Sequence, residues 1–312
     1  MAKAAMLFPG QGSQYVGMGK DLAAAYPRAR ELYERADDTL GFAFSRLCFE
    51  GDAETLTATK NAQPAILLHS AAAARVLGEE GGIEPAIAAG HSLGEYSALV
   101  AAGVLDEMDA LRIVRRRGEL MYEAGLRQPG TMAAIIGLER EDVEEACREA
   151  AGGETVVVAN VNSPGQIVVS GHVGAVERAM KAAAARGAKK TIPLNVSGAF
   201  HSPLVAPAQA ELVAYIESFA LRGASVGVVS NAGAAIVRTK EEIVDALSRQ
   251  LTSPVRWSES MAVLLGEWNG PVLEVGPGKV LSGLLKRIDA SRSAQCAGTA
   301  AELAALVAPR AA

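Results

Sequence analysis

Cysteine is scarce in this chain, with three residues among 312. Cys48, Cys147 and Cys296 form no C-x-x-C pair, so the sequence predicts neither a disulfide framework nor a zinc site. Scattered thiols fit a reducing compartment, and we expect a cytoplasmic protein.

Long apolar runs and a dominant charge are also missing. No uncharged apolar run approaches the roughly 18 residues of a membrane-spanning helix, and the N-terminal apolar run reaches Pro9 and Gly10 too early for a signal peptide. We therefore expect no membrane partner. Lys and Arg number 30 against 35 Asp and Glu, a net charge of −5. That balance argues against nucleic acid as a partner.

The residues that are present predict a globular α/β protein. Half are apolar and 21% are charged, without internal repeats or low-complexity tracts, and 312 residues can form a large and a small core. Strands alternate with helices in 1–126 and 198–312, which predicts a mostly parallel sheet covered by helices. The expected strands are 4–8, 85–90, 226–230 and 272–275, and the expected helices are 62–77 with Pro64 in its first turn, 95–102, 109–124, 209–219 and 240–251.

Residues 127–197 have a different order of elements. Strands are expected at 131–136, 155–160, 166–170 and 191–196, and helices at 139–150 and 173–186. This order, βαββαβ, is typical of a ferredoxin-like module of about 70 residues. We expect a small domain inserted into the large one.

Residues 90–94, Gly-His-Ser-Leu-Gly, match the pattern G-x-S-x-G between a strand and a helix. A serine on such a sharp turn needs small neighbours two residues away on each side, and its hydroxyl is exposed above the sheet. Ser92 is therefore the candidate nucleophile. The N–H of Leu93, at the start of the helix, is a candidate donor to an oxyanion. The alternative is a tight turn without chemistry.

A nucleophilic serine needs a base, and the chain has four histidines. His69 lies within a predicted apolar helix and is expected to pack in the core, and the turn directs His91 away from Ser92. His201 follows a strand in a glycine-containing loop and is the favoured base, with His172 as the alternative.

No acidic residue stands out as a third catalytic member, so a Ser-His dyad is one possibility. Glu274 is the rival partner for the histidine, although it follows His201 in the chain. The glycine loops at 10–12 and 276–278 lack the complete dinucleotide-binding and Walker patterns, so they predict no nucleotide chemistry. The first loop could present the Gln11 N–H as a second oxyanion donor.

Arg117 lies at the centre of an apolar stripe on helix 109–124, whereas Arg115 and Arg116 point the other way. A guanidinium on an inward face needs an anion, and its two parallel N–H groups fit a carboxylate. We interpret Arg117 as the partner of an acidic acyl group. An internal ion pair or a solvent-reaching side chain is the alternative.

Seven segments, in this order, resemble those of the malonyl-CoA:acyl carrier protein transacylase family: 8–14 (FPGQGSQ), 90–97 (GHSLGEYS), 117–118 (RG), 160–166 (NVNSPGQ), 198–203 (GAFHSP), 250–257 (QLTSPVRW) and 274–279 (EVGPGK). The resemblance implies a hydrolase-like α/β domain with a ferredoxin-like small domain. It also implies Ser92 as the acylated nucleophile and His201 as its base. The missing acid is explained, because the family orients this histidine with a backbone carbonyl near Gln250.

The resemblance assigns the remaining site residues too. Backbone amides of Gln11 and Leu93 would form the oxyanion hole, Arg117 would bind the malonyl carboxylate, and Phe200 would limit room for an α-methyl branch. Malonyl would pass from coenzyme A to the phosphopantetheine thiol of holo acyl carrier protein, in fatty-acid or polyketide synthesis, without a metal or other cofactor. We expect a monomer.

Two rival functions share these residues. A serine esterase or thioesterase would pass the acyl group to water, and a scaffold subunit would bind the carrier without catalysis. Acyl carriers of this kind are acidic, so basic residues are candidates for docking them: Lys189, Lys190, Lys286 and Arg287.

Overall fold

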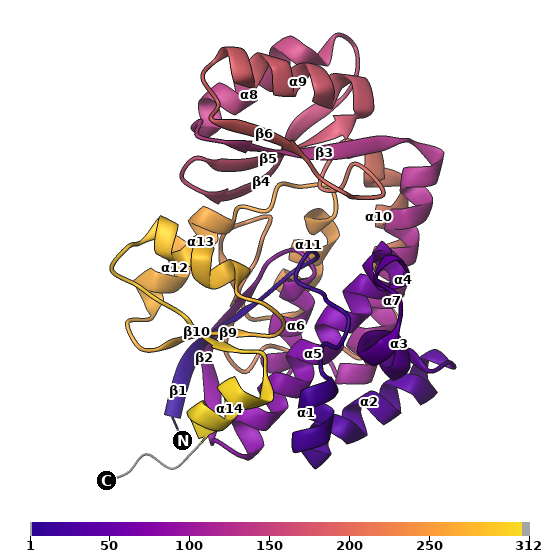
Figure 1. Ribbon diagram of the computed structural model, residues 1–312, viewed down its shortest axis with the longest axis vertical. Helices are drawn as coiled ribbons and strands as arrows, with labels where there is room; N and C mark the ends of the chain where they lie inside the picture. Colours follow the sequence, from indigo (N-terminus) through magenta and orange to yellow (C-terminus); the bar gives the residue numbers. More distant parts are fainter. Residues whose placement is uncertain (1, 308–312) are drawn as a thin grey trace.

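The computed structural model describes residues 2–307, which form two sheets (Figure 1). The larger sheet has the strand order β10-β9-β1-β2-β7-β8, and its neighbouring strands are parallel except for β7 and β8. The mostly parallel sheet expected from the sequence is confirmed. Its strands are β1 (Ala2–Phe8), β2 (Ile83–Gly90), β7 (Gly227–Val229), β8 (Ile236–Val237), β9 (Val272–Val275) and β10 (Gln295–Ala297).

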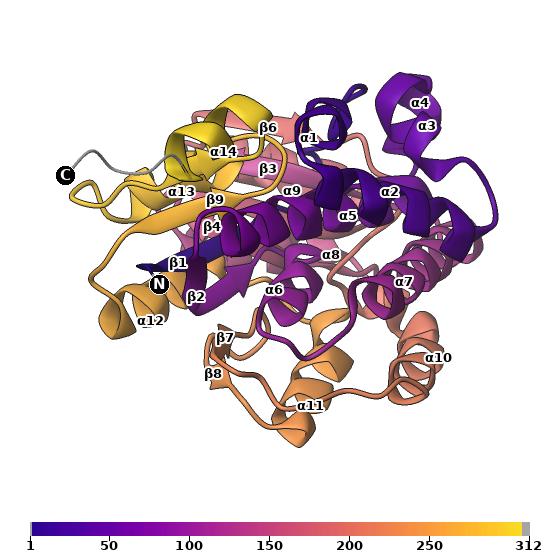
Figure 2. The same ribbon diagram turned by 90° about the horizontal axis from the view of Figure 1, so that it is seen from below.

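The alternation of side chains along β1 gives the large sheet two buried faces. Met6 and Phe8 belong to one core, and Ala5 and Leu7 to another. Helices α5 to α7 cover the first face and lie to the right of β1 and β2 in Figure 2. Helices α12 and α13 cover the second face. A strand covered on both sides is apolar throughout, as its sequence is.

Helices make up the rest of the large part. Before the small sheet lie α1 (Lys20–Ala25), α2 (Pro27–Leu40), α3 (Phe44–Glu50), α4 (Ala53–Thr57), α5 (Thr59–Glu79), α6 (Gly94–Ala101) and α7 (Glu107–Arg127). After it lie the 3-10 turn η1 (Pro203–Val205), α10 (Ala206–Glu217), α11 (Lys240–Gln250), α12 (Trp257–Glu267), α13 (Val280–Ile288) and α14 (Ala300–Val307).

The smaller sheet is antiparallel, with the order β4-β5-β3-β6. That order is the ferredoxin-like one for a βαββαβ chain, so the predicted architecture is confirmed. It has its own core and lies at the top of Figure 1, beneath α8 and α9. Its elements are β3 (Gly130–Ile136), α8 (Arg140–Ala151), β4 (Val156–Ser163), β5 (Gln166–His172), α9 (Val173–Ala185) and β6 (Lys190–Pro193). The domain limits 127 and 197 stay a prediction.

Some boundaries differ from the sequence prediction. Helix α5 begins at Thr59, so Pro64 lies inside the helix rather than in its first turn. The strand expected at 191–196 ends at Pro193, because its pairing with β3 stops there. Helices α12 and α14 were not predicted. Among residues 2–307, no helix is long and apolar enough to cross a membrane.

Glu274 is not the partner of a histidine. Its buried carboxylate accepts the backbone N–H groups of Leu281 and Ser282, at 2.9 and 2.7 Å, and the Ser282 hydroxyl at 2.5 Å. Glu274 therefore caps the N-terminus of α13 from the end of β9. The rival interpretation of this residue was wrong, because its carboxylate is occupied by a helix start.

We predict that Glu274→Gln lowers the free energy of unfolding by about 1–3 kcal/mol. The amide NH₂ group would face the N–H and hydroxyl donors that now bond to the carboxylate, so at least one hydrogen bond would be lost. Urea denaturation measures this change. Glu241→Gln is the matched control, since Glu241 is exposed in the first turn of α11. Equal stability of Glu274→Gln and the unmodified chain would contradict the capping role.

Candidate active site

A cavity of about 370 Å³ lies where the carboxyl ends of β1 and β2 meet the small sheet. The loop after β1 and the turn after β2 line one side of it, and β3, β4 and β5 line the other. Ligands of parallel α/β sheets bind at this edge. The residues expected to act together meet here, including Gln11, Ser92, Leu93, Arg117, Phe200 and His201.

Ser92 sits on a strained turn between β2 and α6, with φ at +51°. A Cβ on Gly90 would lie 1.9 Å from the Gly94 backbone, and one on Gly94 would lie 2.0 Å from the carbonyl oxygen of Phe8. Both glycines are therefore required by close backbone contact. Asn231 holds the turn from β7, because its Oδ1 accepts the Ser92 N–H at 2.6 Å and its Nδ2 donates to the Gly90 carbonyl at 2.7 Å.

His201 contacts the serine, as favoured from the sequence. The distance from Ser92 Oγ to His201 Nε2 is 2.8 Å, and His201 Nδ1 lies 3.0 Å from the Gln250 carbonyl oxygen. A carbonyl can only accept, so Nδ1 carries the hydrogen and Nε2 is free to accept the serine proton. Burial, and then the charge of Arg117, lower the pKa of His201 to about 3, which keeps the imidazole neutral.

The alternative base does not reach the serine. His172 lies at the end of β5, where its Nδ1 accepts the backbone N–H of Thr155 at 3.0 Å. His69 is buried in α5 and contacts the Gly298 carbonyl at 2.7 Å, as a packed core residue. His91 also lines the cavity, and its Nε2 contacts Asn162 Oδ1 at 2.8 Å rather than the serine.

Arg117 is 1% exposed, and its partners are neutral oxygens. Nη1 donates to Gln63 Oε1 at 2.7 Å, and Nη2 donates to Ser92 Oγ at 3.0 Å and to Gln250 Oε1 at 3.1 Å. Its guanidinium carbon lies 5.5 Å from the centre of the Tyr96 ring. Burial lowers its pKa below the ordinary value. The inward orientation predicted for α7 is confirmed, and among residues 2–307 no carboxylate is hydrogen-bonded to the cation, which lines the cavity.

Two backbone amides border the same space. Gln11 and Leu93 line the same cavity as Ser92, and within residues 2–307 neither backbone N–H makes a hydrogen bond. The Ser92 N–H is already taken by Asn231. The side chain of Gln11 holds its loop against α5, because Nε2 donates to Thr59 Oγ1 at 3.2 Å. This geometry leaves two free donors near the serine.

Comparisons with known proteins agree with this geometry. The family model described as "Acyl transferase domain" matches residues 5–306. The malonyl CoA-acyl carrier protein transacylase of Bacillus subtilis is 49% identical over 290 residues, covering 93% of this chain and 91% of the relative. The Escherichia coli K12 transacylase is 47% identical, covering 92% and 93%. This chain belongs to the malonyl CoA-acyl carrier protein transacylase family.

Solved structures of the transacylase family share the whole fold. The transacylase of Xanthomonas oryzae superimposes with a TM-score of 0.94 at 41% identity, covering 98% of both chains. A malonyl-transacylase solved in complex with a type II PKS acyl carrier protein has a TM-score of 0.94 at 44% identity, covering 98% of this chain and 99% of that one. The resemblance noted from seven segments is confirmed.

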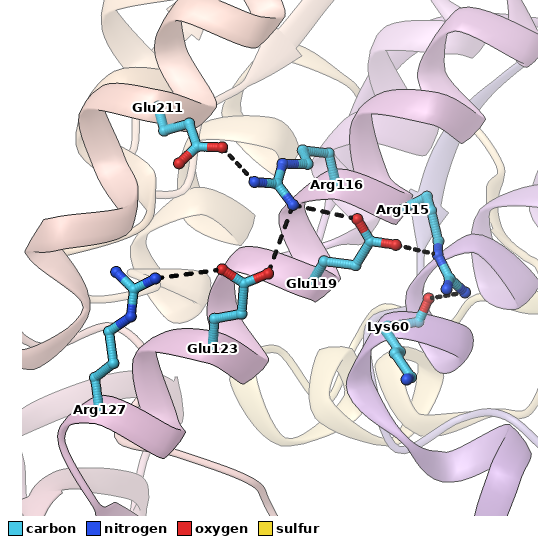
Figure 3. Close-up of polar contacts among 7 residues, drawn as sticks. All are labelled: Lys60, Arg115, Arg116, Glu119, Glu123, Arg127 and Glu211. Atoms are coloured by element: carbon cyan, nitrogen blue, oxygen red, sulfur yellow. Dashed lines mark hydrogen bonds and ion pairs between the residues drawn. The ribbon is translucent and has the colours of Figure 1, made fainter.

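The outer face of α7 in this transacylase has a different character from the face that carries Arg117. Arg115 and Arg116 both pair with Glu119 (Figure 3). Arg116 points outward as predicted, whereas Arg115 also reaches α5, where its Nη1 donates to the Lys60 carbonyl at 3.1 Å and to Asn61 Oδ1 at 2.6 Å. Arg116 also pairs with Glu123 and with Glu211 on α10. These arginines are thus neutralised by neighbouring carboxylates.

Within the described chain, no group of three or more His, Cys, Asp or Glu residues is placed to hold a metal.

Sequence reasoning missed three polar residues of the transacylase site, namely Gln63, Glu95 and Asn231. All three are at most 1% exposed. A polar side chain within an apolar helix is the signal that could have indicated Gln63 and Glu95. Asn231 follows a short strand with no such pattern, so nothing in its neighbourhood distinguishes it from a loop residue.

We predict that Gly90→Ala lowers the free energy of unfolding by about 3 kcal/mol or more, because the new methyl group would overlap the Gly94 backbone. Gly266→Ala in α12 is the control, since a Cβ there meets nothing within 4 Å. It should leave stability unchanged or raise it by about 0.5–1 kcal/mol. Chemical denaturation compares the two, and equal stabilities would refute the close-contact argument.

Proposed function

We propose that this chain transfers a malonyl group from coenzyme A to the phosphopantetheine thiol of acyl carrier protein, through a malonyl ester on Ser92. The observation that carries the proposal is the position of one oxygen. Ser92 Oγ lies 2.8 Å from a neutral imidazole nitrogen and 3.0 Å from a buried guanidinium. A base and a receptor for the acid end of the acyl group thus meet at one nucleophile.

In the first half-reaction, His201 Nε2 takes the proton of Ser92 as Oγ attacks the thioester carbonyl. The oxyanion of the tetrahedral intermediate accepts the N–H groups of Gln11 and Leu93, each worth roughly 10²–10³ in rate. When the C–S bond breaks, the coenzyme A thiolate takes the proton from His201. The second half-reaction reverses these steps, with the carrier thiol as the attacking group.

Arg117 would bind the malonyl carboxylate. The incoming carboxylate offers two anionic oxygens in place of the neutral acceptors Ser92 Oγ and Gln250 Oε1. It also neutralises a charge that lowers the pKa of His201. Binding of the correct acyl group therefore makes the imidazole a stronger base at the moment when the serine proton must move.

The finer assignments belong to the same proposal. Phe200 lines the cavity beside the serine, where its ring would limit a branch on the acyl group. The site is complete within one chain, which supports a monomer, and the thiols are free, which supports a cytoplasmic location. These steps balance without a cofactor. The candidates for docking the acyl carrier protein remain the four basic residues Lys189, Lys190, Lys286 and Arg287. Of these, Arg287 also donates a hydrogen bond to Gln166 Oε1 at 2.5 Å.

We predict that incubation with malonyl-CoA adds one malonyl group to Ser92, and that holo acyl carrier protein removes it. Intact-mass analysis before and after the carrier is added measures both steps. Ser92→Ala should abolish labelling because the nucleophile is lost. Rapid loss of the label without carrier would favour a thioesterase, and no label on the unmodified chain would favour a non-catalytic scaffold.

The same assay tests the base. His201→Ala should slow labelling by at least about 10³-fold, because in the described part of the chain no other imidazole bonds to Ser92. His172→Ala is the matched control and should label at the normal rate. A slow His172→Ala variant with a normal His201→Ala variant would reverse the assignment.

We predict that Arg117→Ala lowers kcat/KM for malonyl transfer by roughly 10–10² more than for acetyl transfer, as expected for a lost charged hydrogen-bond partner. Rates with malonyl-CoA and acetyl-CoA give this ratio. Arg116→Ala is the control on the same helix, because Arg116 pairs with surface carboxylates (Figure 3). Equal losses for both substrates in Arg117→Ala would remove its role in selection.

A further inference from the structure

Glu95 is a buried carboxyl group that follows the nucleophile Ser92 closely in the sequence. The mechanism above does not use it. It lies in the first turn of α6 and is 1% exposed. Its Oε2 accepts Gln250 Nε2 at 2.7 Å and the backbone N–H of Asn231 at 3.1 Å. Both donors belong to residues that hold the serine turn or the base.

The contact with Glu95 fixes which way the Gln250 amide points. Gln250 Nε2 donates to Glu95 and to the Ser92 carbonyl at 2.9 Å, so its Oε1 must face Arg117. A flipped amide would place its oxygen against two acceptors and its NH₂ group against a guanidinium. Because the carbonyl of the same residue holds His201 Nδ1, the orientation of Gln250 also affects the imidazole.

Glu95 also acts on the charge of Arg117. The hydrogen-bond partners of Arg117 are neutral, and Glu95 lies one amide away, because Gln250 donates from Nε2 to Glu95 and accepts from Arg117 at Oε1. Burial lowers the pKa of Arg117, whereas Tyr96 and then Glu95 raise it. Burial in turn raises the pKa of Glu95 to about 7. A malonyl carboxylate would bring a second negative charge to one guanidinium, and a carboxyl group that can take a proton removes the resulting repulsion.

We propose that Glu95 is a positioning residue for malonyl transfer, which orients the Gln250 amide and serves as the counter-charge of Arg117 until the malonyl carboxylate takes that place. This inference rests on the proposed function, because it concerns the same serine, base and guanidinium.

Few other charged or titratable groups face Glu95. Arg117 on α7 and Tyr96 on α6 are adjacent, and His201 and His91 lie across the serine turn. On the neighbouring α5, His69 and Arg75 are directed to Gly298 and Glu107. Lys3 and Glu84 lie at the opposite ends of β1 and β2, and β7 has no titratable side chain. A change in pH near 7 therefore acts on the site chiefly through Glu95 itself.

The test compares Glu95→Gln with Glu95→Ala. The amide keeps an acceptor oxygen for Gln250 and loses the charge, whereas alanine loses both. Quenched-flow intact-mass analysis gives the maximal rate of Ser92 acylation and the apparent KM at pH 6 and pH 8. Malonyl-CoA and acetyl-CoA are measured side by side, so that effects on coenzyme A itself cancel.

At pH 8 unmodified Glu95 is ionised, so Glu95→Gln should lower the KM for malonyl-CoA by about tenfold relative to the unmodified chain. At pH 6 the unmodified carboxyl is protonated, and the two KM values should converge. The KM for acetyl-CoA should respond less at both pH values. Glu95→Ala should lower the maximal rate by about tenfold or more at both, and glutamine should restore it.

Glu274→Gln is the matched control for loss of a buried carboxylate. It should lower stability without changing the pH dependence of the malonyl KM. Identical KM ratios at pH 6 and pH 8 in Glu95→Gln, or equal maximal rates in Glu95→Ala and the unmodified chain, would overturn the inference. Failure of the unmodified chain to form malonyl-Ser92 would instead overturn the proposed function.

Discussion

The site depends on a buried guanidinium, that of Arg117, whose hydrogen-bond partners among residues 2–307 are neutral oxygens. Removing Arg117 from water is costly, and neutral oxygens of Gln63, Ser92 and Gln250 compensate only in part. The apolar stripe of α7 holds the side chain in this position, because the neighbouring turns of the helix are packed against α5. In the proposed reaction, a malonyl carboxylate would supply an anion that bonds directly to Arg117, and the fold already holds the guanidinium in place to receive it.

The serine and its partners come from segments far apart in the sequence, and parallel strands bring them together. Ser92 follows β2, Asn231 follows β7, and the loop with Gln11 follows β1. Since neighbouring parallel strands end at the same edge of the sheet, the three segments meet there. The small sheet covers the remaining side, with Asn160 and Asn162 of β4 lining the cavity. Protein on two sides of the cavity lowers the local dielectric constant, so the charges that line it interact more strongly than they would in water.

Local signals predicted part of this structure well. The G-x-S-x-G pattern placed Ser92, and the period of α7 placed Arg117 inward, because both depend on a few consecutive residues. The βαββαβ order followed from alternation in the same way. Glu95, Gln63 and Asn231 could not be assigned, since their meaning comes from donors and acceptors more than 50 positions away. The role of Glu274 was missed for a different reason: its donors Leu281 and Ser282 follow closely in the chain, but the helix that begins there, α13, was not assigned bounds from the sequence.

Glu95 and Glu274 are both fully buried, and the groups around each one determine whether it contributes to the site or to the stability of the fold. Glu274 accepts three hydrogen-bond donors at a helix N-terminus, where the backbone dipoles favour negative charge. Glu95 accepts two donors, and burial raises its pKa to about 7. The three donors on the Glu274 carboxylate tie β9 to the start of α13, so this residue serves the stability of the fold. A carboxyl group whose pKa lies near 7, one amide away from Arg117, can take up a proton when a second anion arrives. That capacity suits the proposed site, which must accept malonyl, an acyl group with a carboxylate, in preference to acetyl, which has none.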